Sequence, residues 1–207
     1  MSDEQTLWDA RYAAKDYLFG TEPNAYLRSQ AHRFAAGQRA LAVGDGEGRN
    51  AVWLAGLGLE VTLVDISPVG LDKARRLADE RGCRIETIAA DLTRWDWPQD
   101  RFDLAVEIFV HVPVNERRRI HGAMARSLRP GGLALVEAFQ RRQADPVAGS
   151  PPSAGLTQRP LLYDAAALAD DFRMLETVEL LEGTVLLAEG SKHRGPSAVV
   201  RYLGRRI

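Results

Sequence analysis

Short apolar runs that are typical of buried strands alternate with helical patterns along this chain. The strand-like runs lie at residues 40–43, 60–66, 84–89, 102–108 and 133–138. Between them, apolar residues recur at helical spacing over residues 49–57, 68–82 and roughly 115–128. Because each right-handed crossover places its helix on one side of the sheet, this order favours a parallel sheet with helices on both faces. The pattern therefore predicts an α/β fold.

Composition excludes several classes of partner. Lys and Arg number 27 against 28 Asp and Glu, which leaves no basic excess for nucleic acid or an anionic membrane. The single cysteine, Cys83, cannot form an internal disulfide, and the four histidines are too scattered for a metal site. The first residues are acidic, and no apolar run reaches the roughly 18 residues of a membrane span. We expect a cytoplasmic monomer or homodimer.

The regions flanking this core have less regular patterns. Residues 1–38 contain several aromatic side chains in a glycine-interrupted helical context, which indicates a helical cap. Residues 140–160 contain prolines and glycines without periodicity and are long enough for a lid-like loop. A short helix at 164–172 and strand-like runs at 174–181, 184–188 and 198–203 follow. A length of 207 residues fits a single domain over residues 1–207.

The turn after the first strand, "GDGEG", contains Gly44, Gly46 and Gly48. Glycine allows positive φ and a close approach of a ligand to the backbone. A dinucleotide-binding turn needs a third glycine where this chain has Arg49, and the acids Asp45 and Glu47 would repel a pyrophosphate. A cationic or zwitterionic ligand without phosphate suits the turn better. S-adenosylmethionine (SAM) meets that description.

Other strand ends carry side chains that suit the same ligand. Asp65, followed by Ile66, closes the second strand 21 residues after Gly44. A carboxylate at this position accepts both hydroxyls of a ribose, in SAM and in NAD alike. Asp91 and Leu92 follow the third strand, where an adenine edge and face would lie. We therefore expect these residues to line one cofactor site.

These motifs resemble the class I SAM-dependent methyltransferases over roughly residues 39–140. The resemblance is carried by "VGDGEG", "VTLVDIS", "AADL", "FDLAVEIF" and "LRPGG". It implies a Rossmann-like three-layer sandwich with a mostly parallel seven-stranded sheet whose last strand is antiparallel, with SAM across the ends of the first three strands. The family usually has an acid where this chain has Ala42. The ammonium contact then passes to Asp45 or Glu47, shared by the backbone carbonyls of Gly44 and Glu107.

A narrower resemblance, to the tellurite-resistance (TehB-type) methyltransferases, spans most of the chain. It is carried by "WDARY", "FGTEPNAYL", "GEGRNAVWLA" and "AEGSKHR". Similar proteins use a His-Arg pair beside the sulfonium, and the matching residues here are His193 and Arg194. The resemblance implies a small-molecule acceptor such as a chalcogen oxyanion, tellurite or selenite, with a thiol as another soft nucleophile.

An acceptor that carries a proton also needs a base. His111 directly follows the fourth strand, where a parallel sheet presents ligand-binding groups, and His193 is the second candidate. Two alternatives stay open from the sequence: a catalytically silent SAM-binding module and an NAD-dependent oxidoreductase. The acidic turn and Arg49 disfavour the oxidoreductase.

Overall fold

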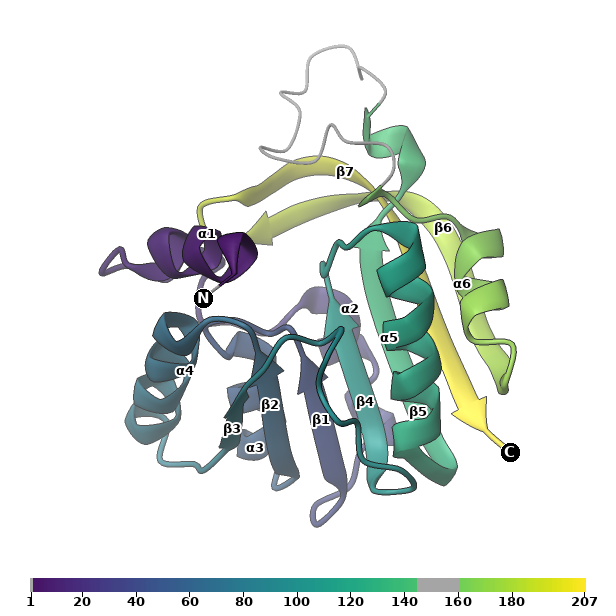
Figure 1. Cartoon of the computed structure of the whole chain (residues 1–207), viewed down its shortest axis with the longest axis horizontal. Helices are drawn as coiled ribbons and strands as arrows, with labels where there is room; N and C mark the ends of the chain where they lie inside the picture. The colour runs from purple at the N-terminus through teal and green to yellow at the C-terminus, as the bar shows by residue number, and fades with distance from the viewer. Residues whose placement is uncertain (1, 145–160) are drawn as a thin grey trace.

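In the computed structural model, which describes residues 2–144 and 161–207, seven strands form one sheet in the order β3-β2-β1-β4-β5-β7-β6 (Figure 1). The strands are β1 (Arg39–Val43), β2 (Glu60–Asp65), β3 (Glu86–Ala89), β4 (Phe102–Ile108), β5 (Leu128–Phe139), β6 (Leu175–Glu189) and β7 (His193–Arg206). Strands β1 to β5 pair in parallel, whereas β7 is antiparallel to both of its neighbours. The expected seven-stranded sheet with an antiparallel last strand is confirmed.

Helices cover both faces of this sheet, which gives three layers. The helices are α1 (Asp3–Tyr12), α2 (Ala25–Ser29), α3 (Arg49–Gly56), α4 (Pro68–Glu80), α5 (Val114–Ser127) and α6 (Ala165–Asp171). Alternate residues of β1 point to opposite faces: Leu41 and Val43 pack in one core cluster with Met124 of α5, and Ala42 packs in the other with Leu54 of α3. The two clusters are therefore the two apolar interfaces of the sandwich.

Helix α4 begins where the sequence predicts. The Ser67 hydroxyl accepts a hydrogen bond from the Gly70 amide at 3.1 Å, and Pro68 occupies the first helical position, where its missing N–H costs nothing. Helix α1 lies beside α4 at the carboxyl ends of the parallel strands (Figure 1). The N-terminal cap therefore covers the edge of the sheet at which ligands usually bind.

The C-terminal strands differ from the sequence pattern. The predicted runs at 174–181 and 184–188 form the single strand β6, because Gly183 keeps its place in the ladder opposite Val199. Strand β7 extends beyond the predicted 198–203 at both ends, and the two strands make a long hairpin that arches over the sheet toward α1 (Figure 1). At its turn, the Ser191 amide donates to the Leu18 carbonyl at 3.3 Å. The hairpin thus reaches the N-terminal segment.

Two further expectations concern loops and membranes. Most of the predicted lid at residues 140–160 lies outside the described residues, apart from Gln140 and the short helix η2 (Arg141–Ala144). Within the described part of the chain, none of the helices is long and apolar enough to span a membrane.

Candidate functional site

The glycine turn between β1 and α3 has the backbone that the sequence predicts. Gly44, Gly46 and Gly48 have φ values of 60°, 52° and 83°, in the left-handed region that favours glycine. A Cβ on Gly46 would lie 2.3 Å from the Tyr12 hydroxyl. Position 46 therefore needs a glycine because any larger residue would clash with the Tyr12 side chain.

Asp45 occupies the N-terminus of α3. Its Oδ2 accepts hydrogen bonds from the amides of Asn50 (3.0 Å) and Ala51 (2.7 Å), and its Oδ1 accepts one from the Asn50 side chain at 2.6 Å. In dinucleotide-binding proteins, amides at this helix end hold the pyrophosphate. In this protein the Asp45 carboxylate accepts hydrogen bonds from amides at this helix end. This turn is therefore unsuited to a diphosphate.

Asp65, the last residue of β2, joins the turn to the start of α4. Its Oδ2 accepts from the Gly46 amide at 2.9 Å and its Oδ1 from the Ser67 amide at 2.8 Å. The side chain is buried but borders a cavity, and each oxygen keeps a lone pair for a ligand hydroxyl. Burial raises the pKa of both Asp65 and Asp45 to about 6, against the opposing effect of these hydrogen bonds.

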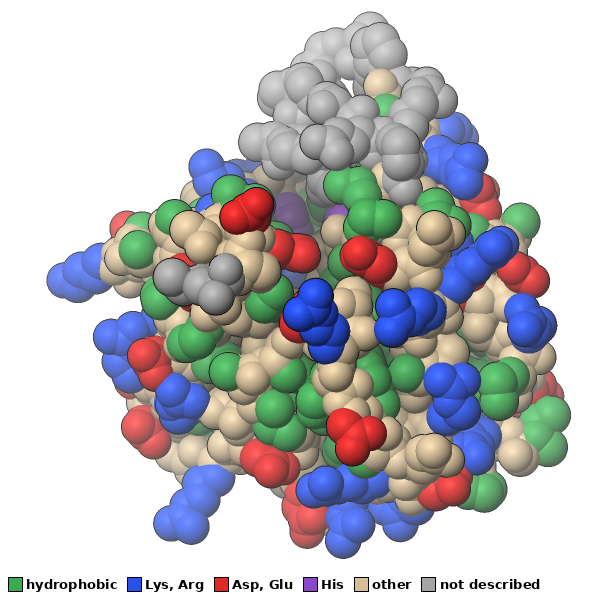
Figure 2. Space-filling view, in the orientation of Figure 1, with side chains coloured by type: hydrophobic (Ala, Val, Ile, Leu, Met, Phe, Trp, Pro, Cys, Tyr) green, Lys and Arg blue, Asp and Glu red, His purple; other side chains and the backbone are tan. Residues whose placement is uncertain are grey.

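A cavity of about 360 Å³ lies at the carboxyl ends of β1, β2 and β4. The sequence-predicted residues in its wall are Gly44, Asp45, Asp65, Ile66, Asp91, Leu92, His111 and His193. In Figure 2, histidine side chains are visible in a recess beside the N-terminal region. The structure therefore brings most of the predicted site residues to one place.

Five predicted residues do not line this cavity: Gly46, Glu47, Gly48, Glu107 and Arg194. The Arg194 side chain is exposed, and its Nε donates to the Gly190 carbonyl at 2.8 Å. Gly46 and Gly48 allow the turn to adopt its backbone conformation, but they do not face the cavity. The two glutamates are buried and contact other parts of the protein.

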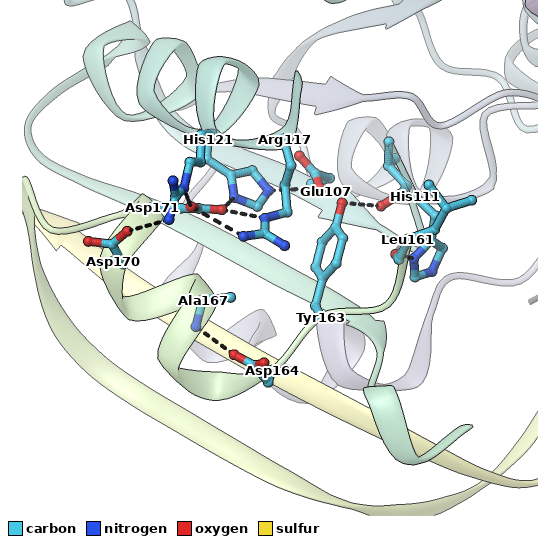
Figure 3. A network of polar contacts seen from close by, with 12 residues as sticks. Glu107, His111, Arg117, His121, Leu161, Tyr163, Asp164, Ala167, Asp170 and Asp171 are labelled. Atoms are coloured by element: carbon cyan, nitrogen blue, oxygen red, sulfur yellow. Dashed lines mark hydrogen bonds and ion pairs between the residues drawn. The ribbon is translucent and has the colours of Figure 1, made fainter. Parts of the chain in front are cut away.

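Glu107 belongs to a buried charge network beneath the cavity, in which both ring nitrogens of His121 contact carboxylates (Figure 3). The Nε2 atom of His121 lies 3.1 Å from Glu107 Oε1, and its Nδ1 atom lies 2.9 Å from Asp171 Oδ2. Arg117 Nε donates to the same Asp171 oxygen at 2.5 Å. Because carboxylates only accept, both nitrogens of His121 carry protons. Burial opposes this charge, but Glu107 and Asp171 outweigh it and raise the pKa of His121.

His111 is held as a neutral imidazole in the cavity wall. Its Nδ1 donates to the Leu161 carbonyl at 2.9 Å (Figure 3), and its Nε2 lies 3.5 Å from the Phe139 amide nitrogen. Burial lowers the pKa of His111 to about 4. The backbone next to His111 is also held in place, because the Tyr163 hydroxyl donates a hydrogen bond to the Val110 carbonyl at 2.7 Å.

His193 is surrounded by aromatic rings. Its ring centroid lies 4.6 Å from those of Phe19 and Phe109 and 5.3 Å from that of Phe139. Its Nδ1 lies 3.8 Å from Glu189 Oε2, which is beyond hydrogen-bond distance. Burial lowers the pKa of His193, although Glu189 opposes the shift. His193 is therefore neutral near pH 7, with a ring nitrogen free to meet a ligand.

Sequence reasoning missed much of the cavity wall. The lining residues that were not predicted as site residues include Trp8, Tyr12, Phe19, Arg49, Phe109 and Phe139. Phe109 has a φ of 54°, a conformation that bulky residues rarely adopt and that often marks functional sites. The aromatic content of residues 1–38 was the available signal. It indicated a cap without indicating which rings enter the cavity.

Comparisons with known proteins agree with this geometry. A sequence model described as a methyltransferase domain matches residues 40–132. A phosphatidylethanolamine N-methyltransferase of Cereibacter sphaeroides is 33% identical over 141 residues, which cover 67% of this chain and 69% of that protein. The chain belongs to the class I SAM-dependent methyltransferases. SAM is thus its methyl donor, and the acidic, phosphate-excluding turn around Asp45 fits that ligand.

Solved structures support the same fold. TehB from Haemophilus influenzae superposes with a TM-score of 0.71 at 18% identity, covering 99% of this chain and 67% of that one. The N-methyltransferase NodS from Bradyrhizobium japonicum, solved with S-adenosyl-L-homocysteine, has the same TM-score at 17% identity and covers 99% of both chains. The likeness therefore does not favour the tellurite-resistance branch over other members of the class.

Affinity of this methyltransferase for SAM is expected to fall below pH 6. Asp45 and Asp65, with pKa values of about 6, become protonated in that range, and the wall of the cavity then loses negative charge that would favour a cationic ligand. If binding requires one ionised carboxylate with a pKa of about 6, Kd at about pH 5 is about tenfold its value at about pH 8. Calorimetric titration across this range measures the change. An unchanged Kd across the range would contradict it.

Proposed function

We propose that this protein transfers a methyl group from SAM to a small molecule bound beside His193. The observation that carries the proposal is that six of the predicted cofactor residues line the same cavity as His111 and His193. Its volume, about 360 Å³, is near the lower end of the usual range for small-molecule pockets. This size favours a small acceptor over a macromolecule.

In this proposal the cofactor residues keep the roles that their positions suggest. Asp65 accepts the ribose hydroxyls with the lone pairs that its backbone contacts leave, and Asp91, Leu92 and Ile66 hold the adenine. With Ala42 in place of the usual acid and Glu47 turned away, Asp45 is the acid of the turn that faces the ammonium group. In this proposal the Gly44 backbone also lies next to the ammonium group of SAM.

When bound, SAM supplies a methyl group on a sulfonium that leaves readily, so the protein's contribution is alignment and exclusion of water. Alignment alone is worth effective molarities of about 10⁵ M or more. The rings of Phe19, Phe109 and Phe139 exclude water around His193. A neutral His193 accepts the proton of an acceptor X–H, and His111 forms part of the wall.

The proposed acceptor is a soft nucleophile, either a thiol or a chalcogen oxyanion such as tellurite or selenite. The TehB-type motifs support this choice. The cations Arg11 and Lys192 in the cavity wall suit an anionic acceptor. An amine is the second candidate, because Glu4 and Glu116 line the same cavity and a curated relative is an N-methyltransferase.

Replacing His193 with alanine is expected to lower turnover by about 10²-fold, the lower end of the range for a positioned base. Affinity for SAM should stay nearly intact, because the ribose and adenine contacts do not involve this side chain. Steady-state kinetics and SAM titration measure the two effects. His32→Ala is the matched control, since His32 lies in η1 (Ala31–Arg33), outside the cavity. Equal loss in both variants would contradict a role for His193.

The function itself is tested by an acceptor screen. Calorimetry with SAM and NAD should give binding heat for SAM alone. Selenite, tellurite, thiols, phenols and ethanolamine are then incubated with protein and SAM, and S-adenosylhomocysteine is quantified. Turnover with tellurite, selenite or a thiol supports the proposal, and turnover with ethanolamine alone supports the second candidate. Binding without product in any reaction would favour a silent SAM-binding module.

A further inference from the structure

Lys73 of α4 is a buried lysine whose ammonium group contacts the N-terminal segment. Its side chain is 3% exposed. The Nζ donates to the carbonyls of Ala14 at 2.9 Å and Asp16 at 2.7 Å, and lies 3.4 Å from the Tyr12 carbonyl. The Tyr17 ring covers the ammonium group at 4.9 Å. A lysine held in this way fixes the backbone that follows α1.

Glu47, in the glycine turn, is the counter-charge. Its Oε1 forms an ion pair with Lys73 Nζ, and its Oε2 accepts a hydrogen bond from the Leu18 amide at 2.7 Å. The Tyr17 hydroxyl also donates to the Lys73 carbonyl at 3.1 Å. The Lys73–Glu47 pair therefore ties residues 12–18 to both the cofactor turn and α4.

Helix α1 has little else to hold it in place. Tyr12 is its only buried residue, and Leu7 is 56% exposed. Asp9 also joins it to the start of α4, because its Oδ1 accepts hydrogen bonds from the Ser67 hydroxyl at 2.5 Å and from the Val69 amide at 3.4 Å. Because apolar burial is small, the contacts of Lys73 and Glu47 contribute a large share of the attachment.

The attached segment is part of the cofactor site. Trp8 and Tyr12 line the cavity, and their rings stack with centroids 5.3 Å apart. Tyr12 lies against both Gly46 and Gly70, where a Cβ would come within 2.3 Å and 2.9 Å of its ring or hydroxyl. The position of this wall therefore depends on the segment that Lys73 and Glu47 hold.

We propose that the Lys73–Glu47 pair is a latch that positions α1 and Tyr12 as a wall of the SAM pocket, so that cofactor affinity depends on two residues that do not touch the cofactor. Both are positioning residues, since their charged groups contact the chain's own backbone and each other. The latch concerns the cofactor alone and holds for any methyl acceptor.

Lys73→Met, which keeps most of the stem and removes the charge, is the first test. Kd for SAM and for S-adenosylhomocysteine, measured by calorimetry without acceptor, is expected to rise about 30-fold, within the range of typical coupling between separate sites. Hydrogen exchange in residues 3–20 should become faster, while kcat at saturating SAM stays unchanged. Lys15→Met, at an exposed lysine of the same segment, should leave both properties as in the wild type.

A double variant separates positioning from general destabilisation. Lys73→Met leaves Glu47 buried without its partner, and adding Glu47→Gln removes that charge while keeping an acceptor for Leu18. If Tm recovers in the double variant and SAM binding stays weak, the latch is supported. If affinity recovers together with Tm, or if Lys73→Met binds SAM like the wild type, the proposal is overturned. Should Lys73→Met not fold, the double variant is compared with the wild type directly.

Discussion

Replacing Asp65 with alanine is expected to abolish measurable SAM binding, with a rise in Kd of more than about 100-fold. The substitution removes the carboxylate that accepts the Gly46 and Ser67 amides at 2.9 and 2.8 Å and that borders the cavity. A hydrogen bond to a charged group contributes about 1.5–3 kcal/mol. Losing two that shape the turn, together with the proposed ribose contacts, accounts for an effect of this size. Calorimetric titration with SAM measures it.

Two companion variants make the Asp65 test specific. Asp65→Asn keeps the shape and one oxygen acceptor, so its affinity should fall between the wild type and the alanine variant. Asp96→Ala changes an exposed aspartate on the loop after Asp91 and should bind SAM like the wild type. Unchanged affinity in Asp65→Ala, with a folded protein by circular dichroism, would contradict the placement of the ribose.

The sequence predicted the parts of the fold that follow from local periodicity and turn chemistry. The strand at Phe102–Ile108 and the start of α4 after Ser67 agree with the prediction, because hydrophobic alternation and helix capping are local properties. The continuous strand β6 was not predicted. Its Gly183 is held in the ladder by β7, and that pairing is a tertiary effect that local propensity does not contain.

Residues of the candidate cofactor site were predictable where the course of the backbone alone brings them to the cavity. Gly44, Asp45 and Asp65 reach the cavity because they lie at strand ends, and strand ends converge in a parallel sheet. Glu47 and Glu107 lie beside them in sequence, yet their longer side chains turn toward Lys73 and His121. Spacing locates a Cα atom. The spacing of residues in the sequence does not show with which distant charged group a glutamate side chain will form an ion pair.

The surroundings of His193, where we propose that the acceptor binds, were the least predictable part of the cavity. His193 was identified through a family resemblance, whereas its neighbours Phe19, Phe109 and Phe139 come from three separate regions of the chain. Phe109 and Phe139 stack at the ends of the paired strands β4 and β5, with ring centroids 4.5 Å apart, and the β6–β7 hairpin brings His193 and Phe19 to them. Contacts of this range have no signature in a single sequence.

The buried network of Figure 3 leads to the second large effect: Asp171→Ala is expected to destabilise the fold by about 3–5 kcal/mol, the usual cost of removing one partner from a buried ion pair. Asp171 accepts from Arg117 at 2.5 Å and from His121 at 2.9 Å. Without it, the buried Arg117 loses its carboxylate partner and His121 keeps only its contact with Glu107. Urea denaturation followed by circular dichroism measures the loss.

Asp170→Ala provides the matched control, because Asp170 is the neighbouring aspartate on the same helix. Its side chain is 51% exposed and lies 3.2 Å from Arg118. Exposed pairs contribute roughly 0–1 kcal/mol, so this variant should unfold almost like the wild type. Comparable losses in the two variants would mean that disruption of α6, rather than the buried charges, causes the effect.

The same network sets a pH window for stability. Hydrogen bonds from His121 and Arg117 outweigh the effect of burial and lower the pKa of Asp171 below its ordinary 3.8, so its contribution is present above that pH and is lost as the pH falls through the lowered value. The pKa of His121 is raised above 6.5, so its contribution is complete below 6.5 and is lost as the pH rises through the raised value. The Asp171→Ala variant should therefore lose less of its free energy of unfolding than the wild type when the pH falls into the acid range. Because the Tyr163 ring lies against the Arg117 guanidinium and its hydroxyl donates to the Val110 carbonyl beside His111, the weakened network should also loosen this wall of the cavity.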